Sequence, residues 1–180
     1  GHGGPSISAA LGLAVARRRQ GKDSKVVAVI GDTSIANGMA FEAMNHAGHI
    51  RENLVVILND NEMSISKSVG AMSRYLNQVI TNPKYNHLRK EVESLIRRVP
   101  KVGDRMLGKI KYIEEGVKHL LVPGQMFESL GFRYFGPLDG HDMERMLDLF
   151  PKIFSMQGPV LVHVITKKGK GMPMAEADPI

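Results

Sequence analysis

The strongest constraint on the fold is an apolar strand–helix–strand pattern near the start of the chain. Residues 25–30 and 54–58 are short apolar runs of strand length, rich in β-branched side chains. Between them, residues 37–47 are rich in Ala and Met, and the following Gly48 is expected to end a helix. Strand, helix and strand within 34 residues predict a right-handed βαβ unit of a parallel sheet, with both strands buried on both faces.

The rest of the chain continues this alternation. A helix is expected over residues 6–19, with Ser6 or Ser8 as its cap and Gly21 beyond its end. The further expected elements are helices at 126–130 and 143–154 and strands at 132–135 and 159–166. The predicted fold class is therefore α/β, a parallel sheet flanked by helices in one domain over residues 1–180, with a helical insertion at about 64–121.

The insertion carries most of the positive charge. Residues 84–120 hold ten Lys and Arg against five Asp and Glu, which is +5 of the net +6 of the chain. These charges alternate with apolar residues at helical spacing, which is typical of amphipathic helices with a solvated face. Stacking aromatics are limited to Tyr85 and Tyr112, so no nucleic-acid partner is expected. Gly and Pro recur throughout, and we expect the segment to be mobile and loosely attached.

Composition excludes several other classes of protein. With 43% hydrophobic and 23% charged residues, the chain has an ordinary globular composition. Its longest apolar runs are five residues, far below the roughly 18 that a membrane span needs, so no membrane partner is expected. No charged-then-apolar leader opens the chain, and we expect no secretion. With no Cys there is no disulfide, thiol nucleophile or Cys-bound metal, which fits a cytoplasmic location.

Polar loops follow three of the predicted strands, at 31–34, 59–62 and 167–171. Open parallel sheets bind ligands beyond the carboxyl ends of their strands, so these loops are expected to meet. Asp32 and Asn61 are hard oxygen donors suited to magnesium, and Thr33 and Ser34 are small enough for backbone N–H groups to approach an anion. The set predicts a magnesium–diphosphate site. The alternative is that Asp32 and Asn61 only cap helices or turns.

Longer strings of the sequence resemble the 1-deoxy-D-xylulose 5-phosphate synthase family of thiamine-diphosphate enzymes, within the transketolase-like superfamily. The spacing of Gly31-Asp32 from Asn61 resembles the magnesium–diphosphate signature of the superfamily. The strings that resemble the synthase family are residues 38–48, 58–66, 122–132, 136–142 and 166–171. The resemblance covers nearly the whole chain and implies the thiamine-diphosphate-binding fold, of which this chain would be a fragment.

The resemblance also implies roles for particular residues. Asp32 and Asn61 should bind Mg²⁺ by side-chain oxygens, with the main-chain carbonyl of Met63 as a third ligand. Thr33, Ser34 and Asn61 should lie against the diphosphate of the cofactor, thiamine diphosphate. Gly1, His2 and Gly3 should lie beside the cofactor, and Met172 stands where the family commonly has a tyrosine near it. Thr33 replaces a family glycine, so its backbone should be either ordinary in φ or strained.

The implied reaction joins pyruvate to glyceraldehyde 3-phosphate, with loss of CO₂, to give 1-deoxy-D-xylulose 5-phosphate for isoprenoid (terpenoid) and thiamine biosynthesis. The implied enzyme is a cytoplasmic homodimeric transferase. The Glu that activates the cofactor and the substrate-contacting histidines of the family lie outside these 180 residues, so the chain alone should be inactive and its own catalytic residues are unknown. The alternatives are another transketolase-like enzyme, or a non-catalytic binding domain that retains the fold.

Two histidines outside these motifs are conspicuous. His141 precedes the helix expected at 143–154, and a structural role beside Asp139 or Asp142 as the helix cap explains it. His163 falls inside a predicted strand, where the sequence shows no evident partner for it.

Overall fold

The computed structural model describes residues 4–63, 69–81 and 124–178. It divides into one unit of residues 1–74 with 126–180, and a second of residues 75–125, of which only 75–81 and 124–125 are described. Most of the insertion predicted at 64–121 therefore lies outside the described residues, as do Gly1, His2 and Gly3. Within the insertion, α4 (Ala71–Thr81) is a helix, as predicted.

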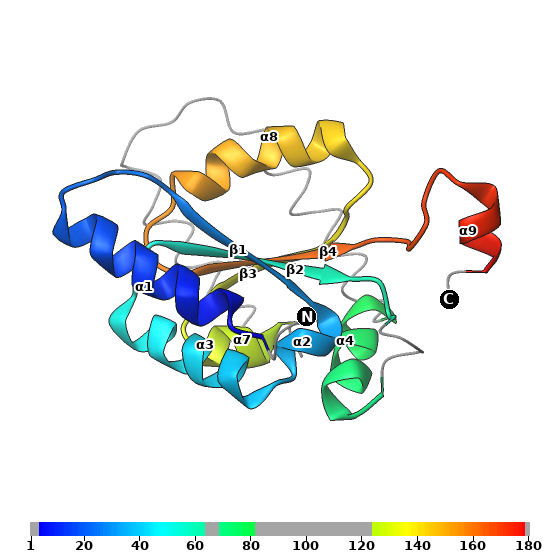
Figure 1. Cartoon of the computed structure of the whole chain (residues 1–180), viewed down its shortest axis with the longest axis horizontal. Helices are drawn as coiled ribbons and strands as arrows, with labels where there is room; N and C mark the ends of the chain where they lie inside the picture. Colours follow the sequence, from blue (N-terminus) through cyan, green and yellow to red (C-terminus); the bar gives the residue numbers. More distant parts are fainter. Residues whose placement is uncertain (1–3, 64–68, 82–123, 179–180) are drawn as a thin grey trace, which may run out of the picture. The chain divides into compact units, whose positions relative to one another are not determined.

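The first unit is built on a four-stranded parallel sheet, which confirms the predicted fold class (Figure 1). Its strands are β1 (Val26–Gly31), β2 (Leu54–Asp60), β3 (Arg133–Asp139) and β4 (Val160–Ile165). The strand order is β1-β2-β4-β3. In the register, Gly31 lies opposite Asn59, and Asn59 lies opposite Val164. The carboxyl ends of β1, β2 and β4 therefore come level at one edge of the sheet.

Helices cover both faces of the sheet. The helices that lie wholly or, for α7, from its second residue on in the first unit are α1 (Ser6–Arg19), α2 (Asp32–Ile35), α3 (Gly38–Ile50), α7 (Gln125–Ser129), α8 (Met143–Phe154) and α9 (Pro173–Ala177). α8 lies on one face, and α1 and α3 lie on the other (Figure 1). The predicted bounds of α1 and α8 are confirmed. Asp142 caps α8 by accepting a hydrogen bond from the Arg145 N–H at 3.1 Å, whereas neither Ser6 nor Ser8 caps α1, which Pro5 precedes.

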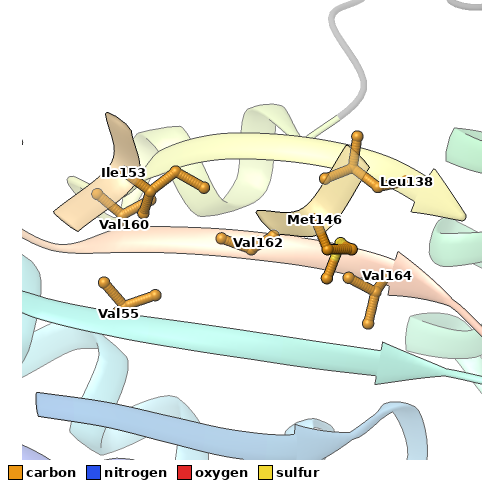
Figure 2. Packing of buried hydrophobic residues seen from close by; sticks show 7 residues of the cluster. All are labelled: Val55, Leu138, Met146, Ile153, Val160, Val162 and Val164. Carbon is orange, nitrogen blue, oxygen red and sulfur yellow. The ribbon is translucent and has the colours of Figure 1, made fainter. Parts of the chain in front are cut away.

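The core between α8 and the sheet is aliphatic (Figure 2). Because β-strand side chains alternate between faces, the residues of β4 that face α8 are Val160, Val162 and Val164. Met146 and Ile153 of α8 pack against them. Burial of this apolar layer fixes α8 on the sheet, and with it the loop that precedes α8.

Gly48 does not end its helix, contrary to the sequence-based prediction. α3 continues to Ile50 and ends at Arg51, whose φ of 53° is left-handed. A Cβ at Gly48 would lie 1.6 Å from the carbonyl oxygen of Leu130. The glycine therefore allows the backbone of the residues after α7 to lie directly on α3, and its role is close packing.

The prediction that β1 is buried on both faces is wrong. Val26, Ala28 and Ile30 are buried against the α1 side, but Val27 and Val29 are 40% and 61% exposed on the α8 side. β1 is an edge strand of the described sheet, and the apolar layer under α8 is formed by β2, β3 and β4. An apolar run cannot distinguish an edge strand from a central one.

Candidate functional site

The two loops that hold the predicted magnesium ligands meet at the carboxyl edge of the sheet. Asp32 directly follows β1 as the first residue of α2, and Asn61 directly follows β2. β1 and β2 are neighbours, with Gly31 opposite Asn59, so the two residues leave adjacent strands at nearly the same level. Asp32 is buried, with 7% of its surface exposed, whereas most Asp side chains in folded proteins are exposed. The register confirms that these two loops leave the same edge of the sheet, as predicted.

The turn after β2 is held in a defined shape by hydrogen bonds to two of its backbone N–H groups. The Asn61 side-chain oxygen accepts the Met63 N–H at 3.0 Å, and the Asp60 carboxylate accepts the Glu62 N–H at 3.1 Å. Glu62 has a φ of 57°, a left-handed conformation that non-glycine residues rarely adopt. A carboxamide oxygen has two lone pairs, so Asn61 can hold this turn and still offer a lone pair to a cation.

Thr33 occupies its position without backbone strain. It lies within the helical residues of α2, and the non-glycine residues with positive φ in the described chain are Arg51 and Glu62. The φ of Thr33 is therefore an ordinary one, and replacing the family glycine with Thr leaves no backbone strain.

The chain before α1 lies against α2. A Cβ on Gly4, which has a φ of 78°, would approach the carbonyl oxygen of Ser34 to 2.9 Å. Gly4 therefore brings the N-terminal segment close to the Asp32–Ser34 turn. The predicted cofactor residues Gly1, His2 and Gly3 immediately precede it, outside the described residues.

The third polar loop, after β4, is engaged with α9 and with the loop before α8. The Lys167 ammonium pairs with Glu176, and the Lys167 N–H donates to His141 Nε2 at 2.8 Å. The hydrogen bond from Lys167, with a second from the Gly171 N–H, lowers the pKa of Glu176 to about 2. Met172 precedes α9 and is 59% exposed, and α9 lies beyond the end of β4, away from α2 (Figure 1).

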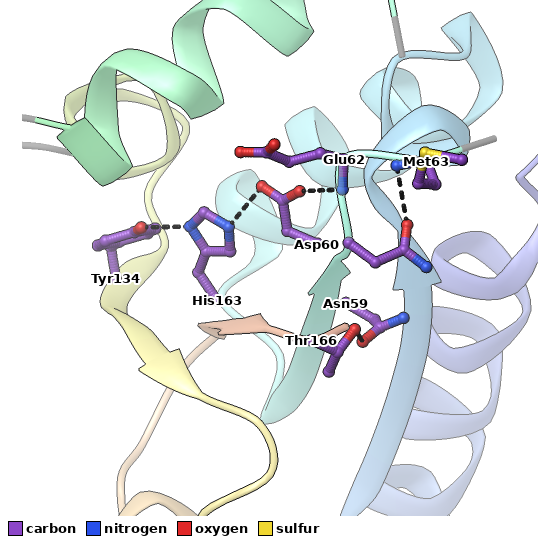
Figure 3. A network of polar contacts seen from close by, with 8 residues as sticks. Asn59, Asp60, Glu62, Met63, Tyr134, His163 and Thr166 are labelled. Carbon is purple, nitrogen blue, oxygen red and sulfur yellow. Dashed lines mark hydrogen bonds and ion pairs between the residues drawn. The ribbon is translucent and has the colours of Figure 1, made fainter. Parts of the chain in front are cut away.

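A buried polar network lies beside the turn after β2, and the sequence did not reveal it. His163 is completely buried; its Nε2 lies 2.9 Å from an Asp60 carboxylate oxygen and its Nδ1 lies 2.7 Å from the Tyr134 hydroxyl (Figure 3). The sequence showed no evident partner for His163, and the structure corrects this: its partners are Asp60 and Tyr134. The partners are 103 and 29 residues away in sequence, so only the register of β2 and β3 against β4 could have indicated them.

The donor set fits magnesium better than a transition metal. Over residues 4–63, 69–81 and 124–178, no group of three or more His, Cys, Asp or Glu side chains could hold a metal ion. Magnesium needs no such group, because it takes one or two carboxylates and completes its shell with phosphate and water. One carboxylate, one carboxamide and one main-chain carbonyl satisfy that requirement.

Among residues 4–63, 69–81 and 124–178, the helices are too short or too polar to span a membrane.

Known proteins share both the sequence and the fold. The family profile described as 1-deoxy-D-xylulose-5-phosphate synthase matches residues 1–166. Proteins of that name from Desulforudis audaxviator and Carboxydothermus hydrogenoformans are 55% and 51% identical to the chain over 179 residues, 99% of its length. The chain spans only 28% and 29% of those two relatives.

A crystal structure of transketolase from Campylobacter jejuni matches the fold with a TM-score of 0.62 at 18% identity, covering 97% of this chain and 22% of the transketolase. At that identity the likeness concerns the fold alone. The match of the family profile to residues 1–166 decides the relationship: the chain belongs to the 1-deoxy-D-xylulose-5-phosphate synthase family.

Proposed function

We propose that this chain supplies the magnesium–diphosphate site of a thiamine-diphosphate enzyme that condenses pyruvate with glyceraldehyde 3-phosphate, releasing CO₂ and forming 1-deoxy-D-xylulose 5-phosphate. The observation that supports this most directly is the convergence of Asp32 and Asn61 at the ends of adjacent parallel strands. Family membership supports the choice of substrates, since the curated relatives carry the name of that synthase.

In this proposal the protein grips the polar end of the cofactor. Asp32, Asn61 and the main-chain carbonyl of Met63 would hold Mg²⁺, which would neutralise the charge of the diphosphate. Thr33 and Ser34 lie against the diphosphate, and their small side chains allow its close approach. When bound, the thiazolium ring of the cofactor supplies the stabilised carbanion that the carboligation needs. The residues of this chain hold that ring at a fixed place through the diphosphate.

The remaining cofactor contacts come from both ends of the chain. Gly1, His2 and Gly3 lie beside the cofactor in this proposal, consistent with the approach of Gly4 to Ser34. Met172 takes the place of the family tyrosine. The chain spans 28% of a relative's length, and in this proposal the catalytic Glu and the substrate-contacting histidines belong to the other parts of such a longer protein. We further propose that the complete protein is a cytoplasmic homodimer whose product feeds isoprenoid and thiamine biosynthesis.

The proposal is tested by calorimetry of thiamine diphosphate binding to the complete protein at several Mg²⁺ concentrations. Asp32→Ala should abolish magnesium-dependent binding and leave the fold intact, because it removes the charged ligand. Asp148→Ala makes the same chemical change on the exposed face of α8 and should leave the affinity unaltered. Equal affinity in Asp32→Ala and Asp148→Ala would overturn the site. The 180-residue chain alone should not turn over pyruvate and glyceraldehyde 3-phosphate.

A further inference from the structure

The Tyr134–His163–Asp60 network ends on the turn that carries the proposed magnesium ligands. One Asp60 oxygen faces His163 Nε2 at 2.9 Å, and the other accepts the Glu62 N–H at 3.1 Å (Figure 3). Glu62 is the residue between Asn61 and Met63. The carboxylate of Asp60 therefore joins a buried histidine to the backbone of this turn.

For an ionised Asp60 and an uncharged His163 ring, chemistry sets the direction of both hydrogen bonds. A carboxylate only accepts, so His163 Nε2 carries the hydrogen and donates to Asp60. In the neutral ring Nδ1 then has a lone pair and accepts the Tyr134 hydroxyl hydrogen. The Tyr134 ring is itself stacked on the buried Phe127, with ring centroids 5.8 Å apart and planes 1° from parallel. The network is thus anchored at its far end by packing.

The backbone of the turn requires such support. Glu62 lies in the left-handed region at a φ of 57°, and strained residues of this kind persist only where their surroundings fix them. The Asp60 carboxylate supplies the hydrogen bond to the Glu62 N–H, and the Asn61 side chain supplies one to the Met63 N–H. If Asp60 moved, Asn61 and the Met63 carbonyl would lose their relative orientation.

Stability alone does not account for this network. Asp60 and His163 have exposed fractions of 2% and 0%, and burying a carboxylate and an imidazole costs desolvation free energy that aliphatic residues of similar volume would not incur. Neighbouring positions of β4 hold such residues, Leu161 and Val162. An aliphatic residue at position 60, however, could not accept the Glu62 N–H.

We propose that Tyr134, His163 and Asp60 are positioning residues that hold the Asn61–Met63 turn in its metal-binding conformation. This inference rests on the proposed function. None of the three residues is assigned a contact with metal, cofactor or substrate. The variants should therefore raise the magnesium concentration that cofactor binding requires, and should leave the affinity at saturating magnesium nearly unchanged.

The test uses the complete protein and measures thiamine diphosphate binding by calorimetry across a series of Mg²⁺ concentrations. Asp60→Ala should raise the Mg²⁺ requirement by about 10- to 100-fold, the usual effect of removing a group that orients metal ligands. Tyr134→Phe changes the side-chain volume little and removes only the hydroxyl that lies beside His163 Nδ1, so it tests the network independently of whether Asp60→Ala folds. It should raise the requirement by several-fold. Asp60→Asn should largely restore binding, because its oxygen can accept the Glu62 N–H and the His163 ring can change tautomer.

Val162→Ala is the matched control. Val162 adjoins His163 on β4, is fully buried and packs on the α8 side of the sheet, so its truncation loosens the core without touching the network. It should lower the thermal unfolding temperature but leave the Mg²⁺ requirement within about two-fold. A second readout, amide exchange at Glu62 without ligand, should accelerate in Asp60→Ala and Tyr134→Phe beyond the change in Val162→Ala.

The outcomes separate this inference from the proposed function. If Asp32→Ala abolishes magnesium-dependent binding while Asp60→Ala and Tyr134→Phe behave like Val162→Ala, the positioning role is refuted and the metal site stands. If cofactor binding to the unmodified protein does not depend on Mg²⁺, the proposed function fails and the inference fails with it.

Discussion

Replacing Gly48 with Ala tests the packing of α3 on the chain that leads into β3. A Cβ built on Gly48 lies 1.6 Å from the Leu130 carbonyl oxygen and 2.8 Å from its carbonyl carbon. Because real Cβ atoms keep at least 3.0 Å from such neighbours, the two segments would have to separate by about 1.4 Å (3.0 minus 1.6). Both obstructing atoms belong to the backbone, so no side-chain rotation relieves the contact.

Two opposing terms set the expected change in the free energy of unfolding. Overpacking in a core costs about 1–3 kcal/mol, and a backbone obstacle places this case at the upper end. Ala is a better helix former than Gly by about 1 kcal/mol, which offsets part of that cost. Gly48→Ala should therefore be less stable by about 2 kcal/mol.

Gly12→Ala is the matched control. Gly12 lies inside α1, is exposed, and has no atom within 4 Å of the position where a Cβ would be built. The same substitution there should gain the helix-propensity term alone, about 1 kcal/mol.

Urea denaturation of the 180-residue chain, followed by circular dichroism, measures both variants. At a typical slope of about 2 kcal/mol per molar urea, the midpoint should fall by about 1 M in Gly48→Ala and rise by about 0.5 M in Gly12→Ala. The packing argument would be refuted by a Gly48→Ala midpoint at or above that of the unmodified chain.

Two further predictions concern the α8 core and the loop after β4. Ile153 is 1% exposed in the α8 layer. Ile153→Ala should therefore lower the free energy of unfolding, measured in urea, by about 3 kcal/mol, and Ile153→Val should lower it by about 1 kcal/mol. Equal losses in the two variants would argue against close packing at this position. The pKa of Glu176 is lowered from 4.5 to about 2, so its stabilising contribution is complete above pH 4.5 and is lost as the pH falls toward 2. Amide exchange at Gly171 should follow that loss, and Glu176→Gln should remove this pH dependence.

The sequence predicted the bounds of helices whose ends depend on residues close to them in the chain. The bounds of α1 and α8 follow from their apolar periodicity and from signals at their ends, such as Asp142 before α8. The convergence of Asp32 and Asn61 was also predictable, because parallel strands place their carboxyl ends at one edge.

Features set by contacts between distant residues were not predictable. Gly48 carries the local signal of a helix end, but its role depends on Leu130, 82 residues later in the chain. The exposure of Val29 depends on where β1 lies in the sheet and on which strands α8 covers. His163 acquires its partners only through strand register.

Hydrogen bonding continues past the carboxyl ends of the strands and ties the site to the sheet. The Thr166 N–H donates to the Asp60 carbonyl at 2.8 Å, and the Thr166 hydroxyl donates to the Asn59 side chain at 2.8 Å. Gly140, after β3, donates its N–H to the Ile165 carbonyl at 2.8 Å. The ends of β2, β3 and β4 are therefore linked to one another beyond the strand hydrogen bonds.

This linkage bears on how the proposed cofactor would bind. Ordering a loose loop on binding costs affinity, whereas a turn already held by the sheet avoids that cost. The turn at Asn61 is held from one side by Asp60 and from within by its own side chain. If the proposed function holds, the turn is therefore ordered before any ligand arrives, and the affinity for magnesium should depend on buried residues that never contact it.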